Sequence, residues 1–314
     1  MVIRKIIKSN VKLTCVWYML DNWLSGLQLS MGNLSTTSGS RHANLRINES
    51  LDYIEKVHRD YLKYGKVDKL SGNIAEIGPG DNFGVALTML SEGANSVHAI
   101  DRWEPQRSKD NMLSIYEALY KKDGYQELFD GPPSERSIKN FYYHPGVAAE
   151  IFFKETNLKF DFILSRAVLE HLYDPLGALD SMINCLSPRG ILIHRIDLRD
   201  HGMFSNHHPL THFTINDKMW SLMTKNAGRP NRILSSDYDN WLKNSGLEGE
   251  ILISRLVGYS KEIEPTSWDK IPSPLRLEAI KHVNSIRKKL TGKYKKIDDN
   301  SLAISGCVLI ARKS

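Results

Sequence analysis

The stretch from Asn73 to Gly84 reads Asn-Ile-Ala-Glu-Ile-Gly-Pro-Gly-Asp-Asn-Phe-Gly, and it decides the expected fold. A short apolar run comes first, glycines follow, and apolar residues at helical spacing begin directly after Gly84. This order predicts a strand, a tight turn and a helix, the arrangement in which a parallel sheet binds a nucleotide. Because glycine has no Cβ, Gly78 and Gly80 allow the turn and let a ligand lie against the backbone.

Acidic residues beside this turn narrow the choice of ligand. Glu76 lies in the apolar run, and Asp81 lies in the first turn of the expected helix. These carboxylates would repel a pyrophosphate at the helix N-terminus but would attract a cationic group, such as the ammonium of a methionine moiety. A second apolar run ends in Asp101, 21 residues after Gly80. A carboxylate at that position can accept hydrogen bonds from both hydroxyls of a ribose.

Two later stretches complete a pattern that resembles a known family. Residues 160–175 read Phe-Asp-Phe-Ile-Leu-Ser-Arg-Ala-Val-Leu-Glu-His-Leu-Tyr-Asp-Pro, and residues 186–193 read Leu-Ser-Pro-Arg-Gly-Ile-Leu-Ile. Together with the Glu-x-Gly-x-Gly turn and the acid after the second strand, they resemble the class I S-adenosylmethionine-dependent methyltransferases over roughly residues 72–197. The resemblance implies an α/β fold with a Rossmann-like, seven-stranded, mostly parallel sheet and an antiparallel last strand. It also implies helices on both faces of the sheet and an N-terminal helical extension.

The resemblance implies S-adenosylmethionine as the cofactor and assigns residues to its parts. The turn would lie under the methionine moiety, with Asp81 contributing at the same end. Asp101 would hold the ribose, and Arg102 would stack beside the adenine. Ser165 ends the fourth strand and would face the same crevice. The expected cofactor-binding residues are Glu76, Gly78, Gly80, Asp81, Asp101, Arg102 and Ser165.

The rest of the chain divides into an extension and an elaborated core. Residues 1–65 are expected to form an N-terminal helical extension or cap, and residues 66–314 the methyltransferase domain. Residues 199–246 depart from the minimal pattern and are expected to form a lid-like insertion over the site. The expected strands lie near residues 73–77, 96–100, 139–143, 160–165 and 190–197, followed by a final pair at residues 250–259 and 302–312.

Transfer to a hydroxyl requires a base, and the insertion is rich in histidine, which titrates near neutral pH. His201 and His208 are the expected general-base residues, and His207 and His212 lie in the same segment. Their spacing matches no standard zinc pattern, so we expect no metal there. His194 lies within the fifth strand and is expected to be packed in the core.

Composition points to an ordinary globular protein in a reducing compartment. The chain has 314 residues and a net charge of +6, without the clustered basic stripe of a nucleic-acid-binding protein. Its three cysteines are far apart, which predicts reduced thiols and a cytoplasmic location. Residues 1–30 form a basic amphipathic pattern, and its longest uncharged run, from Leu13 to Leu20, is too short to span a bilayer. They are expected to pack on their own domain or on a partner subunit, with peripheral membrane contact as the alternative. The oligomeric state is not predicted.

The sequence thus predicts a methyltransferase that modifies a small-molecule or glycan-like acceptor at an oxygen atom, with no nucleic-acid partner. The alternative is a noncatalytic Rossmann-like module that binds S-adenosylmethionine or a nucleotide. A nicotinamide-dependent oxidoreductase would use the same sheet, but Glu76 and Asp81 beside the glycines argue against a pyrophosphate.

Overall fold

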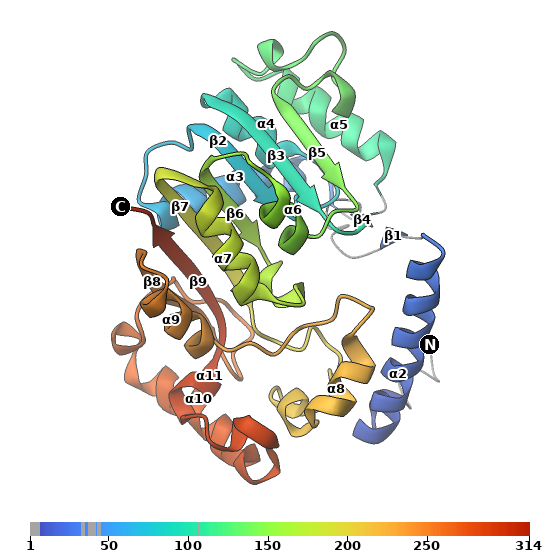
Figure 1. Ribbon diagram of the computed structural model, residues 1–314, viewed down its shortest axis with the longest axis vertical. Helices are drawn as coiled ribbons and strands as arrows, with labels where there is room; N and C mark the ends of the chain where they lie inside the picture. Colours follow the sequence, from blue (N-terminus) through green and yellow to red (C-terminus); the bar gives the residue numbers. More distant parts are fainter. Residues whose placement is uncertain (1–6, 33–34, 37–41, 43–44, 106) are drawn as a thin grey trace. The chain divides into compact units, whose positions relative to one another are not determined.

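A computed structural model describes residues 7–32, 35–36, 42, 45–105 and 107–314. Residues 1–6 and most of the linker between residues 30 and 40 lie outside this range. The predicted fold is confirmed: seven strands form one sheet in the order β5-β3-β2-β6-β7-β9-β8, mostly parallel with an antiparallel last strand (Figure 1). The strands are β2 (Gly72–Ile77), β3 (Ala94–Asp101), β5 (Phe141–Pro145), β6 (Phe160–Arg166), β7 (Leu186–Asp197), β8 (Glu248–Leu256) and β9 (Ile304–Arg312).

The chain forms two compact units, which we describe separately. The glycine-turn unit comprises residues 34–166, 176–194 and 310–314. The histidine-rich unit comprises residues 1–33, 167–175 and 195–309. The chain therefore passes between the units several times, and the boundaries expected at residues 65 and 66 stay a prediction.

The glycine-turn unit contains the parallel half of the sheet. Strand β2 pairs in parallel with β3 and β6, and β3 pairs in parallel with β5. Helices α3 and α4 lie on one face, and α6 and α7 on the other (Figure 1). Gly84 lets α3 approach closely, because a Cβ there would lie 2.2 Å from the Ile54 side chain. The helices are α3 (Ile47–Gly65), α4 (Gly84–Ser91), α5 (Lys109–Tyr120), α6 (Ala149–Glu155) and α7 (Pro175–Cys185).

Strand β5 begins later than the expected strand at residues 139–143. Lys139 donates its backbone N–H to the Leu128 carbonyl, and Asn140 has a φ of +56°. A left-handed residue cannot continue a strand, so the extended backbone starts at Phe141. The apolar pattern identified this strand but not the turn that precedes it.

In the histidine-rich unit, the N-terminal helix α2 (Val11–Ser30) packs against α8 (Asp217–Thr224). Asn22 donates a hydrogen bond of 2.9 Å to the Leu222 carbonyl, and Arg229 forms a 2.6 Å ion pair with Asp21. The opposite side of α2 exposes large apolar side chains. These are Leu13, Val16, Trp17, Leu20, Trp23, Leu24 and Leu27.

No helix among the described residues is long and apolar enough to cross a bilayer. The contact with α8 places the described part of the extension within its own unit. Peripheral membrane contact through residues 1–30 stays a prediction.

The C-terminal half of the histidine-rich unit has its own apolar core, to which β8 and α10 contribute. The expected strand at residues 302–312 is two residues too long at its start. Asp298 caps a short helix by accepting a hydrogen bond from the Ser301 N–H, so Leu302 and Ala303 are helical. After the α-helix that ends at Ile286, the basic stretch up to Lys295 continues as 3-10 turns. The helices here are α9 (Ser235–Asn244), α10 (Ser273–Ile286) and α11 (Asp299–Ala303).

Candidate active site

The glycine turn has the geometry that the sequence predicts. Gly78 and Gly80 have φ angles of +70° and +82°, a region that residues with a side chain rarely adopt. The Gly78 N–H donates a 2.8 Å hydrogen bond to the Ile100 carbonyl, which ties the turn to the end of β3. The turn therefore lies beside Asp101, the last residue of that strand.

Glu76 lies under this turn as a buried acid. Glu76 is only 4 % exposed, and its Oε2 has no hydrogen-bond partner. Burial raises the pKa of Glu76 to about 7. A buried, unsatisfied carboxylate oxygen costs free energy unless a donor or a cation approaches it. The ammonium group and hydrogen-bond donors of S-adenosylmethionine fit this requirement.

Asp101 ends β3 and is also largely buried. Its Oδ1 accepts a 3.3 Å hydrogen bond from the Trp103 N–H. Burial raises the pKa of Asp101 to about 7, against the opposing effect of the Arg107 charge. Asp81 is buried at the turn, and Arg102 lies 5.5 Å from the Trp103 ring centroid. The structure thus brings together the acids that the sequence assigned to this site.

Ser165 differs from the other expected cofactor-binding residues. It is fully buried, and its hydroxyl lies 2.8 Å from His194 Nδ1. At least one hydrogen bond of this hydroxyl is therefore made within the sheet, and a role of Ser165 toward the cofactor stays a prediction. His194 is fully buried too, as expected for a packed histidine, and burial lowers its pKa to about 3.

Sequence reasoning missed Arg107, a cation beside the turn. Its Nη2 lies 3.4 Å from the Gly80 carbonyl oxygen, and its guanidinium lies 4.4 Å from the ring centroids of both Phe83 and Tyr143. Arg107 comes from a long polar segment in which no periodicity distinguishes one arginine from another. Only the folded chain shows that its charge faces Asp101.

A second polar cluster lies in the histidine-rich unit, after the carboxyl ends of β6 and β7. It contains Glu170 and His171 from a 3-10 turn (Leu169–His171), Asp197 at the end of β7, and His201. His201 Nε2 lies 3.6 Å from Glu170 Oε1 and 3.7 Å from Asp197 Oδ2. The His171 and His201 rings meet edge to face with centroids 4.7 Å apart.

Local hydrogen bonds hold the members of this cluster in place. The Asn231 amide donates to the carbonyls of Leu169 and Leu172, and its backbone N–H donates to the Glu170 carbonyl. His201 has a φ of +50°, which is uncommon for a residue other than glycine. Such strained conformations concentrate at functional sites, where the surrounding structure maintains them.

The charges in the cluster differ in how well they are compensated. Burial alone would raise the pKa of Asp197, but hydrogen bonds from Arg199 and the nearby His201 lower it overall. Burial raises the pKa of Glu170 well above its usual range, and the charge of Asp197 adds to this effect. Burial also lowers the pKa of His201, so the neutral ring predominates near neutral pH.

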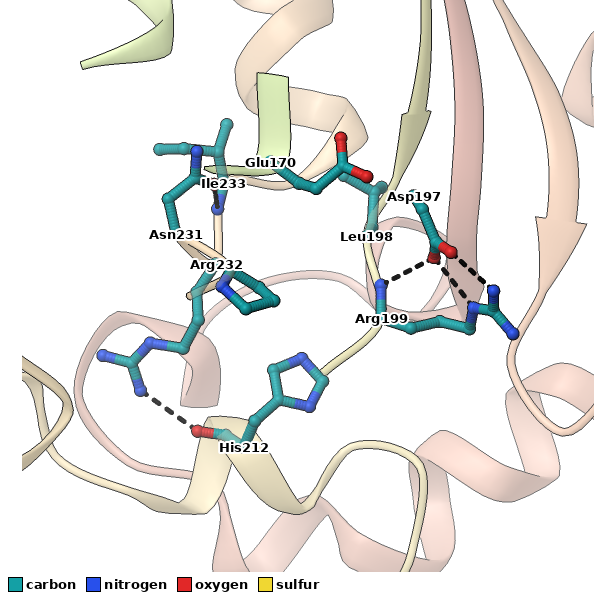
Figure 2. Close-up of a pocket in the computed structure, with 9 residues that line it drawn as sticks. Glu170, Asp197, Leu198, Arg199, His212, Asn231, Arg232 and Ile233 are labelled. Atoms are coloured by element: carbon teal, nitrogen blue, oxygen red, sulfur yellow. Dashed lines mark hydrogen bonds and ion pairs between the residues drawn. The ribbon is translucent and has the colours of Figure 1, made fainter. Parts of the chain in front are cut away.

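A small pocket adjoins the cluster (Figure 2). Glu170 and Asp197 lie on one side and His212 and Arg232 on the other. Neither ring nitrogen of the buried His212 has a hydrogen-bond partner, and burial lowers its pKa to about 4. Arg232 donates to the carbonyls of His212 and Ile215. The pocket has room for roughly one water molecule, and therefore for a single hydroxyl-sized group.

The other two histidines of the insertion lie in different surroundings. His207 Nε2 lies 3.0 Å from the Lys8 carbonyl oxygen. His208 Nδ1 accepts a 3.1 Å hydrogen bond from the Leu210 N–H, and its Nε2 lies 3.2 Å from Ser285 Oγ. Of the two expected general bases, His201 is the one that the described residues place beside carboxylates.

Comparison with known proteins identifies the family of the chain. The model of the family described as "Methyltransferase domain" matches residues 48–250, and the chain belongs to this family. The protein is an S-adenosylmethionine-dependent methyltransferase. No curated protein sequence matches the chain.

Solved structures share the fold at low sequence identity. A methyltransferase from Archaeoglobus fulgidus is 13% identical, with a TM-score of 0.44 and coverage of 84% of this chain and 94% of that one. A putative methyltransferase from Bacillus halodurans is 14% identical, with a TM-score of 0.39 and coverage of 84% and 99%. Phosphoethanolamine N-methyltransferase 2 from Haemonchus contortus is 13% identical, with a TM-score of 0.42 and coverage of 82% and 52%. The matched region therefore spans about half of the latter protein.

The raised pKa values of Glu76 and Asp101 predict that cofactor binding depends on pH. Both carboxyls lose their charge as the pH falls through about 7, whereas their ordinary pKa lies near 4. The charged forms attract the cofactor, so its affinity should fall roughly tenfold or more from about pH 8 to about pH 6. Calorimetric titration at both pH values measures this change.

The variant Asp101→Asn is the matched control for this pH effect. It should bind the cofactor more weakly than the wild type at about pH 8 and lose less affinity on acidification, because one titrating group is gone. An affinity that is constant or rises as the pH falls would exclude these two carboxylates from the cofactor site.

Proposed function

We propose that this methyltransferase modifies a hydroxyl group of a small-molecule or glycan-like acceptor. The observation that supports the proposal is the cluster of Glu170, Asp197 and His201, in which an imidazole lies within 4 Å of two carboxylates. A hydroxyl acceptor must lose a proton during transfer, whereas an amine acceptor needs only its neutral form. The cluster provides the groups that this proton transfer requires.

Within the proposal, His201 rather than His208 activates the acceptor. Its ring is neutral near neutral pH, and the adjacent carboxylates stabilise the positive charge that it gains on accepting a proton. His208 lies beside Ser285 and has no carboxylate partner among the described residues. The ring of His201 is also partly exposed, at 30% of its side chain, so an acceptor can reach it.

The chemistry of the reaction determines which steps the cofactor supplies and which the chain must perform. S-adenosylmethionine, when bound, supplies a methyl group that its positively charged sulfur already activates. The chain must therefore orient the acceptor and remove its proton. The pocket beside Glu170 and His212 accommodates one hydroxyl-sized group and offers it polar neighbours. Polyhydroxylated acceptors, which present several such groups, suit this arrangement.

Incubation with methyl-labelled S-adenosylmethionine and fractionated small-molecule and glycan extracts tests the proposal. Label should enter a low-molecular-weight product and resist mild alkali, as expected for a methyl ether but not for a methyl ester. Label on protein or nucleic acid, or on nitrogen, would contradict the proposed acceptor class. Binding of the cofactor without transfer to any fraction would favour the alternative of a noncatalytic binding module.

A cytoplasmic location is part of the same proposal. The chain has three cysteines, and each is a buried free thiol. Buried thiols without disulfide partners are typical of proteins in reducing compartments.

A further inference from the structure

Three side chains in the histidine-rich unit converge as ligands of a metal ion would. Glu170, His171 and His201 each offer one ligand atom, and these atoms all lie within 4.8 Å of one another. His201 Nε2 and Glu170 Oε1 are 3.6 Å apart, which is too long for a hydrogen bond. Two ligands of one tetrahedral zinc ion, each at about 2.0–2.1 Å, lie about 3.4 Å apart. The observed separation is close to that value.

The orientation of His171 prepares it for such a role. Its Nδ1 lies 2.8 Å from the Gly228 carbonyl oxygen. A carbonyl can only accept, so Nδ1 carries the hydrogen and Nε2 keeps its lone pair. A metal-binding histidine commonly donates its second nitrogen to a backbone carbonyl in this way.

Glu170 provides the second, independent observation. Its side chain is 98% buried, since only 2% of it is exposed, and neither carboxylate oxygen forms a regular hydrogen bond. The backbone amides of Glu170 and Asp197 and the charge of Arg195 act on this carboxylate, as does the negative charge of Asp197. Arg199 pairs with Asp197 instead (Figure 2). A buried carboxylate in this setting requires a cation or must stay protonated.

We propose that Glu170, His171 and His201 bind a divalent transition-metal cation, for which zinc is the probe. Two imidazoles and one carboxylate suit zinc and its neighbours in the series, whereas magnesium prefers oxygen ligands alone. Asp197 lies 3.7 Å from His201 Nε2 and adds negative charge beside the ion. The small adjoining pocket leaves room for one further oxygen ligand.

This inference rests on the proposed function and specifies how the cluster works. A hydroxyl bound to the cation would have a lowered pKa and lose its proton near neutral pH. With the ion bound, the lone pair of His201 Nε2 would be used by the metal, so the acceptor's proton would pass to solvent water, which reaches the partly exposed His201 ring; without the ion, His201 itself accepts the proton. The spacing of the histidines in the insertion does not reveal this set of ligands. Two of the three, Glu170 and His171, come from the segment after β6.

Calorimetric titration of chelator-treated protein with zinc chloride tests the inference. We expect about one ion per chain, with affinity reduced at least tenfold in both Glu170→Gln and His201→Gln. The matched control is His282→Gln. The ring of His282 forms a second histidine pair in this unit with His208, and the two ring centroids are 5.8 Å apart. This control should bind zinc as the wild type does. Equal binding by all four proteins, or no binding by the wild type, would overturn the inference.

Thermal unfolding distinguishes loss of the site from loss of the fold. Without zinc, Glu170→Gln should be at least as stable as the wild type, because it removes an uncompensated buried charge. Zinc should then raise the melting temperature of the wild type but not of this variant. Both proteins should bind S-adenosylmethionine equally. A zinc-induced rise of the same size in both would exclude Glu170 as a ligand.

The two proposals fail in different ways. If His201→Gln abolishes label transfer although the wild type binds no zinc, the hydroxyl-directed function stands and the metal site is wrong. If zinc binds at Glu170 but no fraction accepts label, the metal site stands and the proposed acceptor class is wrong.

Discussion

Replacing Gly78 with valine is expected to weaken S-adenosylmethionine binding by more than about 100-fold. Gly78 has a φ of +70°, where a side chain costs roughly 1–2 kcal/mol and a branched one costs more. To relieve this strain, the turn must change conformation and give up the contact between the Gly78 N–H and the Ile100 carbonyl. The added methyl groups would also occupy the space against which the ligand lies. Isothermal titration measures the loss.

Gly93→Val is the matched control for Gly78→Val. Gly93 has a φ of +104° just after α4, and a Cβ there would meet no heavy atom within 4 Å. This variant carries comparable backbone strain in the same unit without touching the glycine turn. It should lose stability but bind the cofactor normally once folded. Normal binding by Gly78→Val, with its fold intact by circular dichroism, would remove the turn from the site.

The second large effect is expected for His201→Gln, which should lower turnover by about 100-fold or more. Glutamine approximates the length of histidine but neither accepts a proton near neutral pH nor binds a metal ion as strongly. The affinity for S-adenosylmethionine should be unchanged, because the residues that we expect to bind the cofactor belong to the glycine-turn unit. Initial rates at saturating cofactor, together with a cofactor titration, separate the two quantities.

His208→Gln is the natural comparison, because the sequence alone favours both histidines. The hydrogen bond from the Leu210 N–H and the contact with Ser285 indicate a structural role for His208. Its variant should retain turnover within about threefold after correction for stability. If both variants lost turnover equally, the carboxylates beside His201 would not explain which histidine acts.

Local patterns predicted the sheet and the geometry of the glycine turn, whereas the assignment of cofactor-binding residues stays a prediction. A strand, a glycine turn and a helix involve contacts between neighbours in the sequence, so backbone chemistry alone specifies Gly78 and Gly80. Glu76 and Asp101 could be assigned because the carboxyl ends of adjacent parallel strands meet at one edge of the sheet. The same rule placed Ser165 in the crevice but gave no sign that its hydroxyl contacts His194.

The arrangement of the histidine-rich unit depends on contacts between residues that are distant in the sequence. Glu170 and His201 lie 31 positions apart, on either side of a helix and a strand, and neither forms a motif with the other. Their separation of 3.6 Å follows from how β6 and β7 end and from the turn at His201. Helix α2 likewise lies against α8, about 200 residues away, through Asn22 and Leu222. Apolar periodicity predicts a buried face but does not name its partner.

The sequence by itself therefore determined the family, the sheet and the glycine turn with its neighbouring acids, because each follows from backbone conformation and from residues close together in the chain. Only the tertiary structure decided which histidine lies beside carboxylates and that the buried Glu170 carboxylate has no hydrogen-bond partner. Burial and proximity set those properties, and both arise when distant segments pack together.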